Sequence, residues 1–299
     1  MSECAIVIVN WNTKDLLFDC LKSVFECTRG ISFEVWVVDN GSTDGSQDMV
    51  KKSFPQVKLV ETNENLGFAK ANNVAIRKTD TPYVILLNSD TKLTQDTFTS
   101  MMKFVKERKD VGVVGCKLLN RDGSNQPSAA PFYYIWVIFL MLFGFDRFLR
   151  RSFDVTREVD WVVGACMLVT RDAITKAGLL DEAFFMYVEE AEWCYRIKRA
   201  GYKVLYYPIT SLYHLTRGSS TSGKKHAILN IYWGLQYWYT KHGSLFSLIF
   251  VRFLLLTKAV IALGIGFILR RKALIETYRE AIGRIFSFRS FGRRLDDHV

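Results

Sequence analysis

The first 90 residues of this chain alternate short apolar runs with segments of helical periodicity. The apolar runs lie at residues 5–9, 35–38, 57–60 and 84–87, and each is a nearly unbroken series of Val, Ile, Leu and similar residues. Such runs are typical of strands buried on both faces, and helices between them provide the crossovers that parallel strands need. The alternation therefore predicts an α/β fold with a doubly wound, mostly parallel sheet flanked by helices.

A polar loop follows each of these four runs. The loops carry Asn10, Asp39, Asn65 and Asp90. Because the carboxyl ends of parallel strands meet at one edge of a sheet, we expect the four side chains along that edge, where open α/β sheets bind ligands. Each loop taken alone is also consistent with a helix cap. The four loops together indicate a binding site.

The fourth run, entered through Pro82, ends in Asn88-Ser89-Asp90. A short carboxylate at a strand end can hold a divalent cation that bridges a diphosphate and neutralises the charge of a leaving group. The same three residues are also ordinary turn chemistry. Asp90 is therefore a candidate metal ligand whose role depends on what the rest of the chain brings to it.

Four stretches resemble the successive motifs of family 2 glycosyltransferases, and most of all those of the rhamnosyltransferase-like branch. They are IVNWN at residues 8–12, VVDNGSTDG at 37–45, NLGFAKAN at 65–72 and LNSD at 87–90. The resemblance implies a GT-A fold, which is a Rossmann-like α/β architecture. It also implies an inverting transfer from a nucleotide-activated sugar, with a divalent cation, Mg²⁺ or Mn²⁺, as cofactor.

The resemblance also implies roles for the residues that match these motifs. Asp39 is expected to hydrogen-bond the pyrimidine base, and Asp90 to close a D-x-D-like motif on the metal, with Asn88 in place of the first carboxylate. The residues expected to contact the donor nucleotide are Asn10, Asn12, Asp39, Asn65, Gly67, Asn72, Asn88 and Ser89.

A fifth match, LDEAFFMYVEEAEWCYR at residues 180–196, resembles the family's F-D-E-x-F-F-x-Y-x-E-D-x-D-x-x-x-R stretch. Alignment on the E-D pair places Glu190 at the position of the general base, with Glu where Asp is usual. The stretch is predicted to start a helix closed by Gly201. Helical spacing puts Glu189 and Glu192 on one face and Glu190 about 100° away. A solvated acidic face near a helix N-terminus is the alternative.

An extended segment at residues 159–169 contains two small residues, Gly164 and Ala165. Their size allows the backbone to approach a ligand closely. Together with Glu189, they are the candidate contacts for the sugar or the acceptor. Thr170 is predicted to cap a short helix that ends at Gly178.

The last predicted strand lies at residues 203–207, and His214 follows it. In many relatives a His before a Gly/Ser loop reaches the metal or the diphosphate, so His214 is a second candidate metal ligand. A structural histidine is the alternative. Arg217 and Ser220, in the loop after it, are the candidate diphosphate contacts.

The positive charge lies almost entirely in the C-terminal third. Residues 1–199 hold 25 Lys and Arg against 26 Asp and Glu, whereas residues 200–299 hold 15 against 4. Because the basic residues alternate with long aliphatic runs, a membrane with anionic headgroups fits this region better than nucleic acid does. We expect no nucleic-acid partner.

Residues 245–269 are apolar except for Arg252 and Lys258. We expect a helix or helical hairpin embedded shallowly in the membrane, where both cations can reach the headgroups. A true span is the alternative, since the stretch exceeds the roughly 20 residues that a bilayer requires. The uncharged run at 132–145 is too short to span, and we expect a buried or interfacial helix there.

The six cysteines contain no C-x-x-C pair, which favours buried free thiols in a reducing compartment. The N-terminus lacks a signal-peptide pattern, so we expect it to remain in the cytoplasm. We therefore expect a GT-A catalytic domain at residues 1–225 and a helical membrane-associated region at 226–299, on the cytoplasmic face of the cell membrane.

The expected activity is inverting transfer of a sugar from a nucleoside diphosphate donor to a lipid-linked saccharide, in cell-surface polysaccharide synthesis. The rhamnosyltransferase-like branch implies dTDP-L-rhamnose as the donor. A UDP-hexose is the alternative donor. Outside the enzymes, a membrane-tethered nucleotide-sugar binder or a polybasic scaffold would explain part of the pattern, but neither requires the carboxylates after Tyr187.

Overall fold

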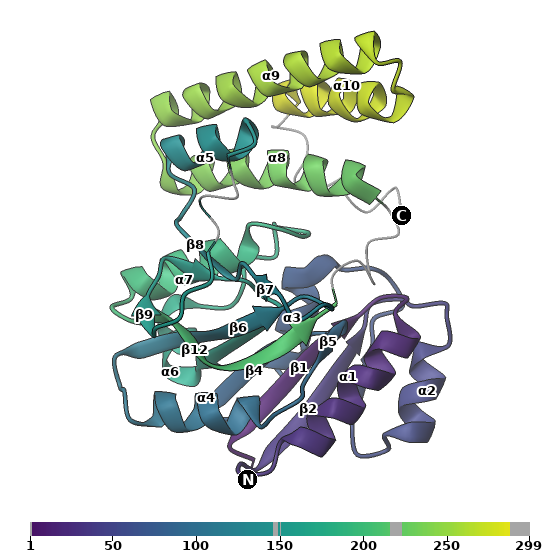
Figure 1. Ribbon diagram of the computed structural model, residues 1–299, viewed down its shortest axis with the longest axis vertical. Coiled ribbons are helices and arrows are strands. Elements are labelled where there is room, and N and C mark those ends of the chain that lie inside the picture. The colour runs from purple at the N-terminus through teal and green to yellow at the C-terminus, as the bar shows by residue number, and fades with distance from the viewer. Residues whose placement is uncertain (1, 146–148, 150, 216–222, 288–299) are drawn as a thin grey trace. The chain divides into compact units, whose positions relative to one another are not determined.

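The computed structural model describes residues 2–145, 149, 151–215 and 223–287 (Figure 1). Contacts within the chain divide it into two compact units that interleave along the sequence. The first unit comprises Met1–Ala130, Arg150–Glu182 and Glu190–Thr221. The second comprises Pro131–Leu149, Ala183–Glu189 and Ser222–Val299.

Within the described residues, the first unit contains a ten-stranded sheet, with the order β3-β2-β1-β4-β11-β6-β12-β5 and with β7 and β9 paired to β6 and β12. A short pair, β8 and β10, stands apart. The strands are β1 (Cys4–Asn10), β2 (Phe33–Asp39), β3 (Lys58–Glu61), β4 (Tyr83–Asn88), β5 (Thr91–Lys92), β6 (Val111–Leu119), β7 (Asn125–Gln126), β8 (Ala129–Ala130), β9 (Arg157–Glu158), β10 (Trp161–Val162), β11 (Cys166–Thr170) and β12 (Lys203–His214).

The first four long strands are parallel, as the alternating pattern predicts. Asn10 at the end of β1 lies beside Asp39 at the end of β2, and Val9 lies beside Asn88 at the end of β4. The polar loops after these strands therefore meet at one edge of the sheet. Beyond β4 the sheet is mixed, because β11 runs antiparallel to both β4 and β6, while β12 is parallel to β6.

Helices cover both faces of this sheet (Figure 1). They are α1 (Lys14–Cys27), α2 (Ser46–Ser53), α3 (Gly67–Ile76), α4 (Thr97–Lys106), α6 (Arg171–Ala177) and α7 (Glu189–Arg199). On one face, α1, α2 and α4 bury a core against Ile6, Ile8 and Ile85. On the other face, Gly112 of β6 leaves room for Ala173 of α6 and Ile197 of α7. Thr170 accepts a hydrogen bond from the Ala173 N–H and caps α6, which confirms the predicted helix.

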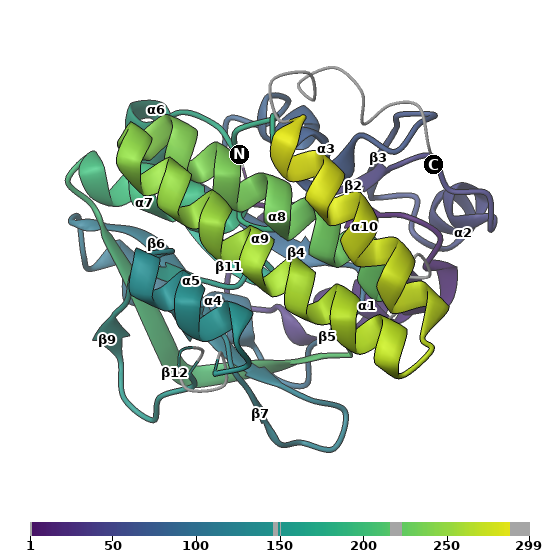
Figure 2. The same ribbon diagram turned by 90° about the horizontal axis from the view of Figure 1, so that it is seen from above.

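The second unit is helical. Its helices are α5 (Ile135–Leu142), α8 (Gly223–His242), α9 (Leu245–Ile268) and α10 (Lys272–Phe286). Helices α9 and α10 lie side by side as a hairpin, both contact α8, and α5 contacts α9 (Figure 2). Ser244 begins α9 with a capping box. One stripe of α9 is buried in this unit, namely Val251, Leu254, Leu255, Ala259, Ala262 and Gly266.

Two elements differ from the sequence prediction. Strand β12 continues past residue 207 to His214, because a register shift between Tyr207 and Ser211 accommodates Pro208, which cannot donate to the ladder. The extended segment at 159–169 is broken into β10 and β11, with Gly164 and Ala165 in the turn between them. Both differences bring predicted site residues to the polar edge of the sheet.

Candidate active site

Asp39 ends β2 with its carboxylate already oriented by protein donors. The Asn10 Nδ2 lies 3.0 Å from Oδ2, while the Ser42 N–H and the Gln47 Nε2 donate to Oδ1 at 2.9 and 2.7 Å. The residue is only 1% exposed. Because three donors converge on it, the carboxylate is held in one orientation at the end of the strand.

The same network reaches from β1 to the loop after β4. The Thr13 hydroxyl donates to Asn10 Oδ1 at 2.7 Å and lies 2.9 Å from the Ser89 hydroxyl. Asn12 adopts φ 53°, a left-handed conformation that Asn tolerates, and its Oδ1 accepts from the Thr43 N–H at 2.8 Å. The structure therefore brings Asn10, Asn12 and Ser89 together with Asp39.

Asn65 and Gly67 join this edge through Asn40. Asn65 Oδ1 accepts from Asn40 Nδ2 at 2.8 Å and from the Gly67 N–H at 3.0 Å. Gly67 has φ 77°, which a residue with a side chain would adopt only with strain. Asn72 lies deeper, within α3, where its Nδ2 donates to the Phe68 carbonyl at 2.9 Å. Asn72 therefore supports the helix rather than the polar edge.

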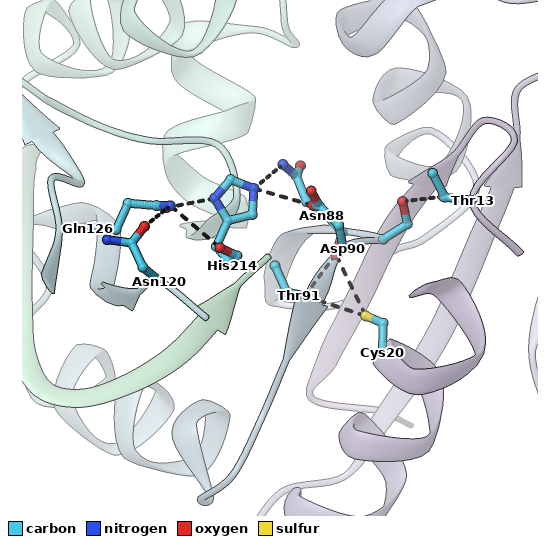
Figure 3. A network of polar contacts seen from close by, with 9 residues as sticks. Thr13, Cys20, Asn88, Asp90, Thr91, Asn120, Gln126 and His214 are labelled. Carbon is cyan, nitrogen blue, oxygen red and sulfur yellow. Dashed lines mark hydrogen bonds and ion pairs between the residues drawn. The ribbon is translucent and has the colours of Figure 1, made fainter. Parts of the chain in front are cut away.

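Asp90 and His214 face each other across the end of the sheet (Figure 3). Asp90 Oδ1 lies 3.3 Å from His214 Nε2, and both side chains are about nine-tenths buried, at 6% and 11% exposure. Asn88 Nδ2 lies 3.3 Å from the same nitrogen. His214 reaches this position because β12 extends beyond Pro208. Two residues 124 positions apart in sequence thus form one pair.

This pair fits a divalent cation that also binds a diphosphate. Carboxylate oxygen suits Mg²⁺ and Mn²⁺, and such ions usually take one or two protein ligands together with substrate phosphates. Among the described residues, no three His, Cys, Asp or Glu side chains gather as a complete metal site. Asp90 and His214 would therefore hold the cation together with oxygens of a bound diphosphate.

The side chain of Asn88 faces His214, whereas its backbone carbonyl is held by Thr91 and Cys20. The Thr91 hydroxyl donates to it at 2.8 Å, and the Cys20 thiol lies 3.6 Å from it and 3.4 Å from the Thr91 hydroxyl (Figure 3). Burial raises the pKa of Cys20 to about 12. The thiol therefore stays protonated and structural. All six cysteines are free, as the sequence predicts.

The three carboxylates at the start of α7 have different surroundings. Glu192 is fully buried, and Arg196 Nε lies 2.9 and 3.0 Å from its two oxygens. Arg196 also donates to the Leu179 carbonyl at 2.7 Å. Glu192 is thus bound in a structural ion pair. Glu189 is 3% exposed, whereas Glu190 is half-buried and is the most accessible of the three.

Helix α7 begins at Glu189 instead of near residue 180. The two preceding residues, Tyr187 and Val188, have φ 72° and 75°. A β-branched residue rarely adopts this conformation, and each such residue costs on the order of 1–3 kcal/mol. The backbone therefore turns sharply just before the helix. Periodicity along the sequence cannot reveal such a turn, which is why the predicted start is about nine residues early.

Gly164 and Ala165 lie at the same edge of the sheet. The Asn88 N–H donates to the Ala165 carbonyl at 3.0 Å. A Cβ added to Gly164 would lie 3.3 Å from Phe68 Cζ and 3.7 Å from Glu190 Cβ. Gly164 therefore brings the backbone close to Glu190. Arg217 and Ser220 lie outside the described residues.

Sequence reasoning missed several members of the site. Thr13, Asn40 and Ser42 lie inside or beside motifs that drew attention for other residues. Gln47 and Gln126 carry no sequence signal, because a lone Gln is ordinary on a helix or at a strand end. Their place in the network becomes visible only in the folded chain.

Comparison with known proteins shows which family this chain matches. The family model described as "Glycosyl transferase family 2" matches residues 5–177. The N-acetylglucosaminyl-diphospho-decaprenol L-rhamnosyltransferase of Mycobacterium tuberculosis is 27% identical over 201 residues, which is 60% of this chain and 66% of the relative. The low-salt glycan biosynthesis hexosyltransferase of Haloferax volcanii is 26% identical over 67% of this chain and 62% of its own length. The matches thus span slightly under two thirds of these relatives.

A solved structure shows the same fold. The mannosyltransferase of Pyrobaculum calidifontis, in complex with GDP-mannose and Mn²⁺, superposes with a TM-score of 0.58 at 17% identity, over 99% of this chain and 88% of that one. The likeness confirms the expected GT-A architecture.

Proposed function

Because this chain belongs to family 2 of the glycosyltransferases, we propose that it transfers a sugar with inversion from a nucleoside diphosphate donor to a lipid-linked glycan. The rhamnosyltransferase of M. tuberculosis, whose name specifies a diphospho-decaprenol substrate, supports dTDP-L-rhamnose as donor and a lipid-linked acceptor. The hexosyltransferase relative keeps a UDP-hexose as the second candidate donor. The cellular role is the synthesis of a cell-surface polysaccharide.

The observation that carries this proposal is the pairing of Asp90 with His214 at the polar edge of the sheet, 3.3 Å apart. The Asp39 network on the same edge is the place for the base, and Asp90 and His214 are the place for the diphosphate. A divalent cation bound there, Mg²⁺ or Mn²⁺, would neutralise charge on the nucleoside diphosphate as it leaves.

Glu190 is the residue that we assign as the general base. Its carboxylate takes the proton from the acceptor hydroxyl, whose oxygen forms the new bond to the anomeric carbon of the donor. The bond from that carbon to the phosphate oxygen breaks on the opposite face, and this displacement inverts the configuration. Glu190 is half-buried at the start of α7, beside Gly164. A non-catalytic sugar-nucleotide binder would not need a carboxylate there.

The second unit is the part that we propose to bind the membrane. Among the described residues, α9 alone is long and apolar enough to cross a bilayer, with mean hydropathy 2.3 and 28% of that stretch buried. One stripe of α9 packs within the unit, which supports an interfacial position over a span. Arg252 donates to Gln236 of α8 at 3.2 Å, so this cation is accommodated by protein.

The apolar surface left exposed in this unit is large. Its aromatic members among the described residues are Tyr134, Trp136, Phe139, Phe145, Phe246, Phe250, Phe253, Phe267 and Phe286. The basic residues Arg270, Arg271 and Lys272 follow α9 directly and favour anionic headgroups. We place this face on the cytoplasmic leaflet of the membrane that holds the acceptor lipid.

A panel of nucleotide sugars tests the proposal directly. Purified protein is incubated with dTDP-rhamnose, UDP-hexoses and GDP-mannose, with and without Mn²⁺ or Mg²⁺, and donor hydrolysis and transfer are measured. We expect turnover of one donor class that requires the cation. Absence of turnover with every donor, despite cation-dependent binding of a nucleoside diphosphate, would favour the non-catalytic alternative.

The variant Asp90→Ala tests the cation site. It should abolish turnover and the cation-dependent part of nucleoside diphosphate binding while the fold survives, because it removes the carboxylate ligand. Asp48→Ala, which removes an exposed carboxylate of α2, is the matched control and should change neither. Calorimetry showing unchanged cation-dependent affinity in Asp90→Ala would remove Asp90 from the site.

A further inference from the structure

A chain of hydrogen bonds, which we call the relay, runs from Asp122 in an exposed turn through Ser124, Asn120 and Gln126 to His214. Figure 3 shows the part of it from Asn120 to His214. The Ser124 hydroxyl lies 2.6 Å from Asp122 Oδ1, and Asn120 Nδ2 lies 2.9 Å from the Ser124 Oγ. Gln126 Nε2 lies 3.0 Å from Asn120 Oδ1, and Gln126 Oε1 lies 2.7 Å from His214 Nδ1. The turn joins β6 to β7, and none of its residues belongs to a motif of the sequence.

The exposed end of the relay decides which group donates and which accepts in each of its hydrogen bonds. Hydrogen bonds from Ser124 hold the pKa of the Asp122 carboxyl below its ordinary value, so the group is ionised and only accepts. The single hydroxyl proton of Ser124 must therefore point to Asp122. The Ser124 oxygen is then an acceptor, and the Asn120 group facing it must be the NH₂.

The orientation of each amide follows from the one before it. With its NH₂ toward Ser124, Asn120 presents Oδ1 to Gln126, so the Gln126 NH₂ must face Asn120. Gln126 consequently presents Oε1 to the imidazole. An oxygen acceptor 2.7 Å from His214 Nδ1 requires that Nδ1 carry the proton.

On the other side of the ring, His214 Nε2 faces an amide donor and a carboxylate. Asn88 Nδ2 and Asp90 Oδ1 each lie 3.3 Å from this nitrogen. In the neutral ring with Nδ1–H, the electron pair of Nε2 thus points toward an anionic oxygen. Two acceptors at this distance repel each other unless a proton or a cation lies between them.

We propose that Gln126 is a positioning residue that, oriented by Asn120, Ser124 and Asp122, holds His214 in the Nδ1–H tautomer. The electron pair of Nε2 then faces Asp90 and is ready for a cation. Its use for a cation rests on the function proposed above, whereas the tautomer itself does not. Without the relay, the neutral ring could place its proton on Nε2 and donate to Asp90, and a cation would have to displace that hydrogen bond.

The tautomer is measured directly by ¹⁵N NMR of the imidazole. The chain has four histidines, so comparison with a His214→Ala sample identifies the signal. Spectra are recorded at alkaline pH, and the ¹⁵N shifts of the two ring nitrogens identify the neutral ring and its tautomer. We expect the Nδ1–H tautomer in the wild-type protein. An Nε2–H signal there would overturn the proposal.

Three variants separate the relay from general effects on the fold. Gln126→Leu removes the acceptor and should shift the ring toward Nε2–H. Gln126→Glu keeps an acceptor oxygen and should restore Nδ1–H. Gln95→Leu is the matched control, because Gln95 donates to Thr210 and Ser211 on the same strand without touching His214. An Nδ1–H tautomer that persists in Gln126→Leu would overturn the proposal.

A fourth variant tests the exposed end of the relay. In Asp122→Asn the new amide can donate to Ser124, so the donor and acceptor roles along the relay are no longer fixed. We expect a mixture of tautomers at His214, although the substituted residue is exposed and well removed from the ring. A pure Nδ1–H signal in this variant would show that Asp122 does not set these roles.

Cation binding gives a second readout, independent of turnover. Mn²⁺ affinity in the presence of a nucleoside diphosphate, measured by calorimetry, should fall about 10- to 100-fold in Gln126→Leu and remain unchanged in Gln95→Leu. Unchanged affinity in Gln126→Leu, despite an altered tautomer, would overturn the link to the cation. If His214→Ala also binds Mn²⁺ normally, the failure lies in the metal assignment of the proposed function.

Discussion

Glu190 and Glu192 are two positions apart in α7, yet their surroundings predict different effects of replacement by Gln. We expect a loss of transfer at Glu190 and a loss of stability at Glu192. Glu190→Gln removes the proton acceptor from a half-buried position. We expect it to keep nucleotide-sugar binding and to lose transfer by roughly 10²- to 10⁴-fold. Glu190→Asp, which keeps a carboxylate, should retain measurable activity. Transfer rates and donor affinities of the purified variants check both expectations.

Glu192→Gln is the matched variant of the same helix. Its target is a buried carboxylate held by Arg196, so we expect a loss of stability of about 3–5 kcal/mol. Urea denaturation measures this loss. A stable but inactive Glu192→Gln protein beside an active Glu190→Gln protein would move the general base to Glu192.

At the residue scale, the sequence predicts side chains that belong to motifs and misses those that orient them. Asp90 and His214 are predicted as a pair and lie 3.3 Å apart. Gln126, which contacts His214, is not predicted. Its contribution depends on a two-residue strand pairing with β6, and so short an element leaves no periodicity in the sequence.

At the scale of elements, Asn73 of α3 joins the helix to the segment that leads toward α7. Its Nδ2 donates to the Leu180 carbonyl at 2.8 Å, and its Oδ1 accepts from the Leu180 N–H at 3.1 Å. Asn73→Ala should lower the free energy of unfolding by about 2–4 kcal/mol, because both buried backbone groups lose their partner. Urea denaturation measures this, with Asn230→Ala of α8 as the control.

The same site predicts a pH dependence. Burial raises the pKa of Glu182, but hydrogen bonds from Asn73 and Arg77 outweigh it and leave the pKa below the ordinary value of 4.5. A lowered pKa contributes stability above the unfolded-state value, and this contribution is lost as pH falls through the folded-state value. The stability difference between wild type and Asn73→Ala should therefore narrow below about pH 4.5. A difference that does not change with pH would contradict this reading.

The sequence predicts most elements well and two of them poorly, each for a local reason. The parallel strands and their helices follow from long apolar patterns. The sequence predicts that strand β12 ends before Pro208, because proline interrupts a strand except at an edge or a bulge. The start of α7 is fixed by the backbone conformation of Tyr187 and Val188, which no side-chain pattern encodes.

At the scale of the whole molecule, membrane binding is the property that the second unit should carry. Phe250 and Phe253 of α9 are 47% and 60% exposed. Replacing both with Asp should weaken binding to vesicles with anionic lipids at least about tenfold, because burial of each Phe contributes about 1.5–3 kcal/mol. Cosedimentation measures the affinity. Val155→Asp, at a 66% exposed position of the first unit, is the control and should bind normally.

Extraction of membranes with carbonate at high pH then separates the two modes of attachment. Release supports an interfacial α9–α10 hairpin, as we propose. Retention in the membrane fraction would favour a spanning α9.

A domain boundary at residue 225 stays a prediction. Each of the two compact units is built from several separate segments of the sequence, which a single boundary does not describe. The helix α5 belongs with α8 and α9, and the Tyr239 hydroxyl donates to the Tyr133 carbonyl at 2.7 Å. Apolar composition identifies these segments as helical. It does not identify their partners, because packing between segments 100 residues apart depends on the three-dimensional fold.

The length of β12 gives the chain an uneven tolerance to insertions and deletions. Successive side chains of a strand point to opposite faces, so the loss of one residue between Ser211 and His214 would turn the imidazole away from Asp90. A residue gained or lost at the bulge around Pro208 would be absorbed where the ladder is already irregular. We therefore expect natural length variation in this strand to concentrate at the bulge, while the number of residues from Ser211 to His214 stays constant.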